Sequence, residues 1–416
     1  MSRTIFTNAN LLDGVHPARA GVTVVVEGQR ITAVDTEGVP ATADDAVFDL
    51  GGKTIMPGMV TGHYHVAYDH VHSPEEIDMK HSAGYTTLVA AKNAELTLRS
   101  GYTGAIGAAC IHNIDATLKQ AIADGLIIGP RLLASSRDLC TTAGPVDTRP
   151  DHWGPMPDGV ARLCDGADEF RKAVRQEIKL GADVIKVHVT GGHGVQCDPE
   201  DVIMTDEELS AAVQTAHGLG RRIRGHVASK RGILQAVAAG MDIVDHADGM
   251  DEECIERLVA AGTFVVPSAH LFRVIIDGGR QTGQMPPAVL DFMEAEYQRN
   301  CQAVLSASKA GVKLVPGDDY GTFIDHGDYS KELELYVTHA GVDPLEVITW
   351  ATRNGAEMLG MGSELGMVEA GRLADLLVVD GDPSVDITVL QDRSRLHAVM
   401  KDGQFVQCSL QEGIVQ

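Results

Sequence analysis

The sequence predicts an α/β fold: a (β/α)8 TIM-type barrel with a small β-sandwich domain formed by both ends of the chain. Residues 57–364 alternate short apolar runs with stretches of 3.6-residue periodicity. Residues 1–56 and 365–416 instead consist of short β segments broken by Gly and Asp turns. These ranges are the two domains that we expect.

The terminal domain is expected to contain strands at Val22–Glu27, Ile31–Val34, Ala374–Val379, Ala398–Lys401 and Gln404–Gln407. The eight barrel strands are expected at Thr54–Met59, Thr86–Ala90, Arg131–Ala134, Val184–Val189, Arg222–His226, Ile243–His246, Thr263–Pro267 and Lys313–Pro316. Helices are expected at Glu169–Leu180, Asp206–Leu219 and Asp251–Ala261. Several strands follow a glycine that can end a helix, namely Gly181, Gly220, Gly240, Gly262 and Gly311.

The composition limits the partners and the compartment. The chain has 416 residues and a net charge of -24, which disfavours nucleic acid and anionic membrane partners. No apolar run approaches the roughly 20 residues of a membrane span, and the N-terminus lacks a signal-peptide pattern. Seven cysteines without a CxxC pair favour a reducing cytoplasm. We expect a small-molecule substrate and a homo-oligomer.

The first candidate for chemistry is a histidine pair at the end of the first barrel strand. Strand alternation places His63 and His65 on one face, close enough to bind the same metal ion. Such a pair also occurs by chance among core or surface histidines. The pair therefore needs partners from other strand ends.

Lys186 lies in the middle of the apolar fourth strand, where an ammonium group is costly to bury. Two interpretations remain open. The lysine either pairs with a buried carboxylate, or it reacts with carbon dioxide to form a carbamate that can bridge two metal ions.

Three further strands end in possible metal ligands. The fifth ends at His226, the sixth at His246, and the eighth is followed by Asp318 and Asp319. Each residue is ordinary alone, because a capped helix or a core histidine would explain it. Functional residues of TIM barrels project from the C-terminal ends of the strands, so the joint pattern indicates a metal centre.

These motifs together resemble the amidohydrolase superfamily, close to its prolidase-like and imidazolonepropionase-like branch. The resemblance covers nearly the whole chain. It rests on Pro57-Gly58 before the histidine pair, Lys186 followed by Thr190-Gly191-Gly192, His226 and His246 at consecutive strand ends, Gly317–Asp319, and Gly371–Leu376 near the C-terminus.

The resemblance implies a centre of two divalent ions, with zinc the expected metal. His63, His65 and Asp319 would hold one ion and His226 with His246 the other, bridged by N6-carboxylated Lys186. Asp319 would also be the catalytic proton acceptor and donor, and His270 would stabilise the oxyanion. The expected substrate-binding residues are His188, His193, Arg273 and His326.

The expected reaction is hydrolysis of an amide-type C–N bond in an N-acyl amino acid, dipeptide, anilide, urea or carbamate. Relatives that cut dipeptides commonly carry Gly-Gly-His after the third strand, whereas this chain has Thr141–Asp147 there. This departure weakens the dipeptide assignment. A mononuclear cyclic-amide hydrolase or deaminase is the alternative enzyme, and a catalytically silent barrel scaffold is the non-enzymatic alternative.

Overall fold

The computed structural model describes residues 3–35, 39–148, 152, 159–192, 197–283 and 285–413. The chain divides into two compact units. One comprises Met1–Thr61, Glu95–Gly104 and Gly327–Gln416, and the other comprises Gly62–Ala94 and Ala105–His326. Among the described residues, no helix is both long and apolar enough to cross a bilayer.

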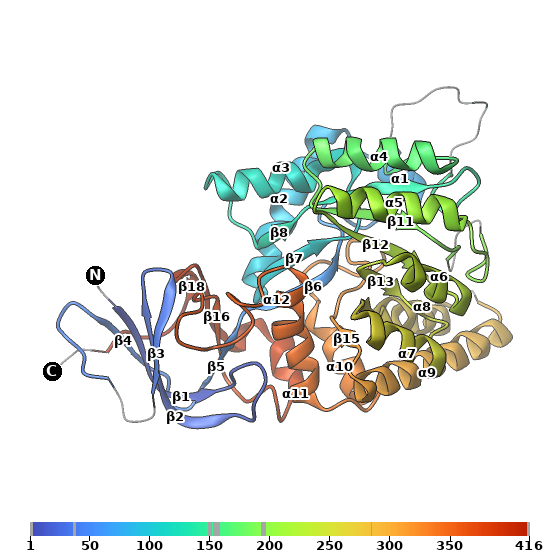
Figure 1. Ribbon diagram of the computed structural model, residues 1–416. Helices are drawn as coiled ribbons and strands as arrows, with labels where there is room; N and C mark the ends of the chain where they lie inside the picture. The colour runs from blue at the N-terminus through green and yellow to red at the C-terminus, as the bar shows by residue number, and fades with distance from the viewer. Residues whose placement is uncertain are drawn as a thin grey trace. The chain divides into compact units, whose positions relative to one another are not determined.

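The second unit carries most of the strands of a parallel barrel and the helices around them, and the strands Met59–Tyr64 and Tyr102–Gly107 run from the first unit into the second (Figure 1). Seven strands lie in the order β10-β9-β11-β12-β13-β14-β15 and three in the order β6-β7-β8. Their bounds are β6 Met59–Tyr64, β7 Tyr102–Gly107, β8 Arg131–Leu133, β9 Ser135–Cys140, β10 Ala161–Leu163, β11 Val184–His188, β12 Arg222–Val227, β13 Ile243–His246, β14 Phe264–Val266 and β15 Lys313–Leu314.

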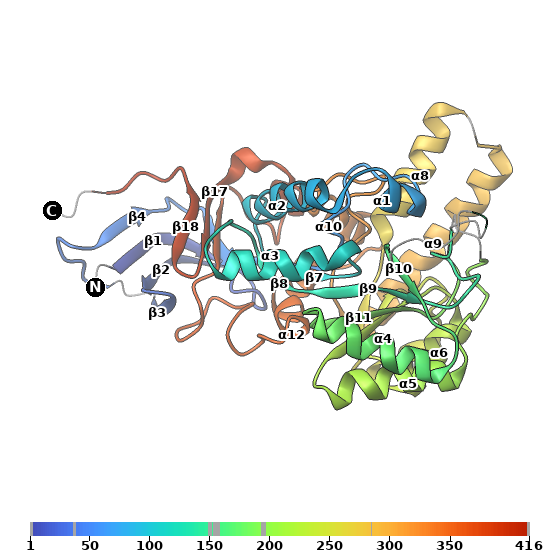
Figure 2. The same cartoon turned by 90° about the horizontal axis from the view of Figure 1, so that it is seen from above.

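Helices connect most of the successive strands, as is typical of a TIM-type barrel, although β8 is followed by β9 after a single residue. They are α1 Pro74–Met79, α2 Ala83–Arg99, α3 Ile114–Ala123, α4 Ala167–Lys179, α5 Asp206–Gly218, α6 Lys230–Ala239, α7 Glu252–Ala261, α8 Ala269–Thr282 and α9 Pro287–Ala310, with the 3-10 turn η1 at Ile111–Asn113. Helices α4 and α5 lie side by side, as do α8 and α9 (Figures 1 and 2).

Local sequence explains where the helices begin and end. Thr205 accepts a hydrogen bond from the Glu208 amide while the Glu208 side chain accepts one from Thr205, which is a capping box at the start of α5. Gly240 and Gly262 end α6 and α7 in the left-handed conformation. The chain then enters the next strand without a long loop.

The first unit contains an eight-stranded sheet in the order β18-β17-β16-β5-β1-β2-β3, with β4 paired to β1. Its strands are β1 Arg3–Leu11, β2 Arg19–Glu27, β3 Arg30–Asp35, β4 Ala46–Asp49, β5 Thr54–Pro57, β16 Leu376–Val379, β17 Leu396–Lys401 and β18 Gln404–Cys408. Its helical segments are α10 Ser330–Thr338, α11 Pro344–Thr349, η3 Trp350–Asn354, α12 Gly355–Met358, η4 Ile387–Gln391 and η5 Arg393–Arg395.

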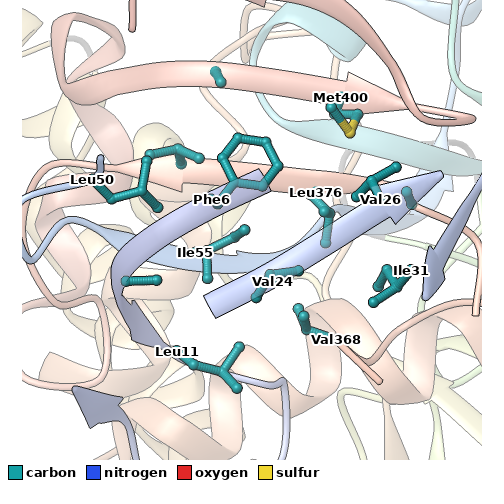
Figure 3. Close-up of a cluster of buried hydrophobic side chains, with 14 of the residues drawn as sticks. Phe6, Leu11, Val24, Val26, Ile31, Leu50, Ile55, Val368, Leu376 and Met400 are labelled. Atoms are coloured by element: carbon teal, nitrogen blue, oxygen red, sulfur yellow. The ribbon is translucent and has the colours of Figure 1, made fainter. Parts of the chain in front are cut away.

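Residues from both ends of the chain share one apolar core on this sheet (Figure 3). Phe6 and Leu11 pack there with Leu376 and Met400, and each is almost fully buried. The Phe6 and Phe48 rings lie 5.8 Å apart, so aromatic packing joins neighbouring strands.

Two predicted barrel strands are wrong. Thr86–Ala90 lies inside α2, and the second strand is β7. The apolar run belongs to a longer helical segment, whereas β7 contains two glycines and little of the β-branched pattern that marks a strand. The run at Thr54–Pro57 is β5 of the terminal sheet, and the first barrel strand begins only at Met59.

The third strand was predicted too short. Arg131–Ala134 covers β8, but the chain continues through β9 to Cys140. This extension brings Asp138 next to Lys186 in the pairing of β9 with β11. Residues 135–138 are polar, so the sequence pattern did not indicate a strand there, although every side chain of β9 is buried.

Candidate metal centre and its cavity

Three side chains converge where β6 ends and where the chain leaves β15. The Nε2 atoms of His63 and His65 lie 3.0 Å apart. Asp319 Oδ1 lies 3.0 Å from His63 Nε2 and 3.1 Å from His65 Nε2. Two ligand atoms that each lie about 2.1 Å from one ion are themselves about 3 Å apart. These three atoms therefore fit a common divalent metal ion.

The other two predicted histidine ligands lie beside this group. The ring centroids of His246 and His63 are 5.3 Å apart, and those of His246 and His226 are 4.4 Å apart. His246 has a φ of 70°, a left-handed conformation that is unfavourable for a residue with a side chain. The local fold holds His246 in place despite this strain.

Hydrogen bonds orient three of these rings. His65 Nδ1 donates to the Ala109 carbonyl at 3.2 Å, and His226 Nε2 donates to the Gly191 carbonyl at 3.0 Å. His246 Nδ1 lies 2.9 Å from Ser268 Oγ. In each ring the second nitrogen remains for a metal ion, an arrangement typical of metal-binding histidines.

The electrostatic environment also suits metal binding. Burial lowers the pKa of His63 to about 3 and that of His226 well below its usual value. Burial alone would raise the pKa of Asp319, but the neighbouring His63 and His65 hold it well below its usual range. Neutral imidazoles and an ionised carboxylate are the forms that bind metal ions.

Lys186 forms an ion pair in this structure. Its Nζ lies 2.7 Å from Oδ2 of the fully buried Asp245. Arg224 also binds this carboxylate, with Nε 3.0 Å from Oδ2 and a second, shorter contact from Nη2. Asp245 therefore keeps one cationic partner whatever the chemical form of Lys186.

The two adjacent acids have different environments. The buried Asp318 accepts hydrogen bonds from the backbone amides of His270 at 2.7 Å and Leu271 at 3.0 Å, at the start of α8. Burial and the neighbouring charge of Asp319 raise the pKa of Asp318 to about 7. Asp318 thus anchors α8, whereas Asp319 faces the histidines.

A cavity of about 660 Å³ opens above the converging side chains. Its titratable lining includes His63, His65, Asp138, Lys186, His188, His226, His246 and Asp319, and much of the remaining wall is apolar. The six predicted metal ligands therefore share one cavity. This volume lies within the range of small-molecule binding sites.

His188 also lines this cavity. Its Nε2 donates to Asp138 Oδ1 at 3.0 Å, and its ring stacks on His226 with centroids 4.9 Å apart. The buried Nδ1 has no hydrogen-bond partner among the described residues. This nitrogen is a candidate acceptor for a substrate N–H.

Two other predicted site residues, His270 and Arg273, do not face the cavity. His270 is buried in the first turn of α8, and Arg273 binds Asp277 and Glu294. Neither is among the described residues that line the cavity. His193 lies outside the described residues.

His326 contributes indirectly rather than from the cavity wall. Its Nε2 donates to the Tyr68 carbonyl at 3.1 Å. The Tyr68 ring stacks on His65 at a centroid distance of 4.4 Å. His326 thus supports a residue that packs against a predicted metal ligand.

Sequence reasoning missed Asp138, Asp245, Ser268 and Tyr68, which orient or pack against predicted site residues: Asp138 against His188, and the other three against predicted metal ligands. Asp138 could have been found by extending the third strand to its true end. Ser268 follows the seventh strand and satisfies the strand-end rule, but a lone serine is too common to stand out. Tyr68 lies on a loop, whose conformation has no periodic pattern.

Comparisons with known proteins agree with this geometry. The model of the amidohydrolase family matches residues 54–406. Ochratoxinase from Aspergillus niger is 29% identical over 378 residues, covering 84% of this chain and 75% of the relative. Imidazolonepropionase from Micrococcus luteus is 26% identical over 435 residues, covering 97% and 99%. The crystal structure of a prolidase complexed with N-methylphosphonate-L-proline has a TM-score of 0.87 at 27% identity, covering 98% of this chain and 100% of that chain.

Proposed function

The chain belongs to the amidohydrolase family and is a hydrolase of C–N bonds, and on this premise we propose that it cleaves an amide-type bond of a small molecule at a centre of two divalent metal ions. The observation that carries the proposal is the convergence of His63, His65 and Asp319 beside His226, His246 and Lys186 in one cavity.

The donor set fits metal ions. His63, His65 and Asp319 would hold one ion, and His226 with His246 the second, with carboxylated Lys186 between them. Zinc is the proposed metal for this nitrogen and oxygen set. Divalent ions in such a site would act as Lewis acids. They would lower the pKa of a water molecule toward neutrality and polarise a carbonyl group.

The protein's own groups would move the proton and orient the substrate. Asp319, ionised beside the histidines, would accept a proton from the attacking water and deliver it to the departing nitrogen. His188, held by Asp138, would accept a hydrogen bond from the substrate N–H through Nδ1. The oxyanion role predicted for His270 would require its ring to reach the cavity, which it does not line.

One observation supports a second candidate, a mononuclear enzyme that hydrolyses a cyclic amide or deaminates its substrate. Lys186 is paired with Asp245, as expected for a lysine with a structural role. In that case His63, His65 and Asp319 would hold a single ion and Lys186 would remain unmodified.

A hydrolysis screen separates these candidates. Metal-loaded protein is incubated with dipeptides, N-acyl amino acids, anilides, phenylureas and carbamates, and with cyclic amides and amino-heterocycles. We expect turnover of acyclic amide-type substrates, with dipeptides cut more slowly because the Gly-Gly-His motif is absent after the third strand. Ring opening or ammonia release alone would contradict the proposal and favour the mononuclear enzyme.

A further inference from the structure

Helix α8 forms one wall of the cavity and starts at the metal centre. The amides of His270 and Leu271 in its first turn bind Asp318, which directly precedes Asp319. The cavity-lining residues of the helix are Leu271, Val274, Ile275, Gly278, Gly279 and Thr282. Most of them recur at intervals of three or four, so they share one face over twelve residues, about 16 Å along the axis.

Away from the predicted metal ligands, the cavity lining is mostly apolar. Outside α8 the cavity is also lined by the apolar residues Val71, Ile77 and Phe323, interspersed with His72, Ser73 and Thr322. Phe323 is 50% exposed although it is a large aromatic residue. An apolar ligand group would cover these surfaces and remove them from water.

Two neighbouring glycines of α8 differ in their surroundings. A Cβ atom at Gly279 would lie 2.6 Å from Met285 Sδ and 2.9 Å from Leu290 Cδ2, so close packing explains that glycine. A Cβ atom at Gly278 would meet no atom within 4 Å. A side chain would fit at Gly278, and glycine weakens a helix interior relative to alanine. Packing therefore gives no reason for glycine at this position, whereas keeping the cavity open does.

We propose that the substrate carries a large, uncharged apolar group, of the size of a fused-ring aromatic or a medium-length acyl chain, that lies along α8 with the scissile bond at the metal centre. Gly278 sets how far this group extends. The inference rests on the proposed amide hydrolysis and specifies its substrate class. Removing one methylene from water is equivalent to about a fourfold change in binding, so specificity increases with the size of the group until the cavity is full.

The test uses two series of amides with metal-loaded protein. One series varies the acyl group of 4-nitroanilides from acetyl to octanoyl, and the other pairs acetyl with aniline or 1-naphthylamine. In at least one series, kcat/KM of the wild type should increase at least tenfold from the smallest to the largest member. Gly278→Leu should reduce the ratio of kcat/KM between the largest and the smallest member at least tenfold. Gly278→Ala should reduce this ratio less while raising Tm.

Gln281→Leu is the matched control, because it adds the same side chain to an exposed position of the same helix outside the cavity lining. It should keep the wild-type ratio. The neutral fluorophore 6-propionyl-2-dimethylaminonaphthalene gives a readout independent of turnover, and its Kd should rise at least tenfold in Gly278→Leu only.

The outcomes separate the inference from the proposed function. The inference is wrong if wild-type kcat/KM does not increase with the size of the apolar group. It is also wrong if Gly278→Leu keeps both the wild-type ratio of kcat/KM values and the wild-type affinity for the fluorophore. Neither result contradicts amide hydrolysis. If the metal-loaded wild type cleaves no amide while the fluorophore still depends on Gly278, the proposed function fails but the apolar subsite stands.

Discussion

At the scale of single residues, Asp318 and Asp319 show how two identical side chains take different roles because their surroundings differ. Asp319 Oδ1 lies within 3.1 Å of two histidine nitrogens, whereas Asp318 is fully buried and accepts backbone hydrogen bonds from α8. One carboxylate is available for metal binding and proton transfer. The other holds the helix that forms the cavity wall.

Replacing these acids should therefore have different effects. Asp319→Asn removes the anionic ligand and proton acceptor, so kcat should fall by about 10²–10⁴-fold with an unchanged circular dichroism spectrum. Asp318→Asn should retain measurable turnover and bound metal but lower Tm, because α8 loses its anchor. A severe loss of turnover in Asp318→Asn with little change in Asp319→Asn would show that the roles are reversed.

The buried His326 should make stability depend on pH. Burial lowers its pKa to about 4 from an ordinary 6.5. The unfolded chain takes up this proton below about pH 6.5 and the folded chain only near pH 4, so the free energy of unfolding falls as pH decreases between these values. The slope approaches about 1.4 kcal/mol per pH unit.

His326→Gln keeps a donor for the Tyr68 carbonyl but cannot be protonated. Urea unfolding at pH 7 and pH 5 should show that the variant loses about 1–2 kcal/mol less than the wild type over this interval. His339→Gln, at an exposed position after α10, is the control and should match the wild type. The same loss in His326→Gln as in the wild type would exclude this effect.

The convergence of the six proposed ligand residues on one cavity could be predicted because these residues break the local pattern. A histidine at the end of an apolar strand, or a lysine in the middle of one, is unusual, and the strand period shows which face it occupies. The contact residues Arg273 and His270 could not be placed this way. Their side-chain directions depend on how α8 packs, and in Arg273 the nearby Asp277 and Glu294 already bind the guanidinium group.

At the scale of elements, the contact between β6 and the segment after β15 positions His63, His65 and Asp319, the proposed metal ligands. Gly62 donates its amide proton to the Pro316 carbonyl at 2.7 Å. A Cβ atom on Gly317 would lie 2.2 Å from the His63 backbone nitrogen. The two segments approach so closely because Gly317 has no side chain.

Gly317→Ala should push these segments apart. We expect a loss of about 1–3 kcal/mol in the free energy of unfolding, as for other overpacked sites, and weaker metal binding because His63 and Asp319 separate. Gly218→Ala, at an open position in α5, is the matched control and should be neutral or slightly stabilising. Metal analysis and urea unfolding check both variants, and unchanged metal content in Gly317→Ala would contradict this account.

Helices and strands could be predicted where one hydrophobic periodicity dominates the segment. Helices α4, α5 and α7 were predicted to within about two residues, because each has a regular apolar face and a defined end. Strand β7 was missed because its small residues leave no alternating pattern, and its position depends on close packing that no single sequence displays.

At the scale of the whole molecule, metal content distinguishes the two proposed enzymes. Metal analysis of loaded protein should give two divalent ions per chain, and chelation should lower Tm, since a ligand at a thousand times its Kd contributes about 4 kcal/mol. Lys186→Ala should lose activity and metal, with partial rescue by short carboxylic acids. One ion per chain, with full activity in Lys186→Ala, would establish the mononuclear centre.

The contact between Gly62 and Pro316 also has a consequence for folding kinetics. His65 and Asp319 are separated by 254 residues, and bringing them together closes a loop that includes every intervening strand. Contacts of such long range form slowly and late. A nascent chain that ends before β15 would lack the acidic ligand, and an ion bound across this contact would slow its reopening. Metal binding would therefore slow unfolding, and this kinetic stabilisation would arise only after the preceding strands of the barrel have folded.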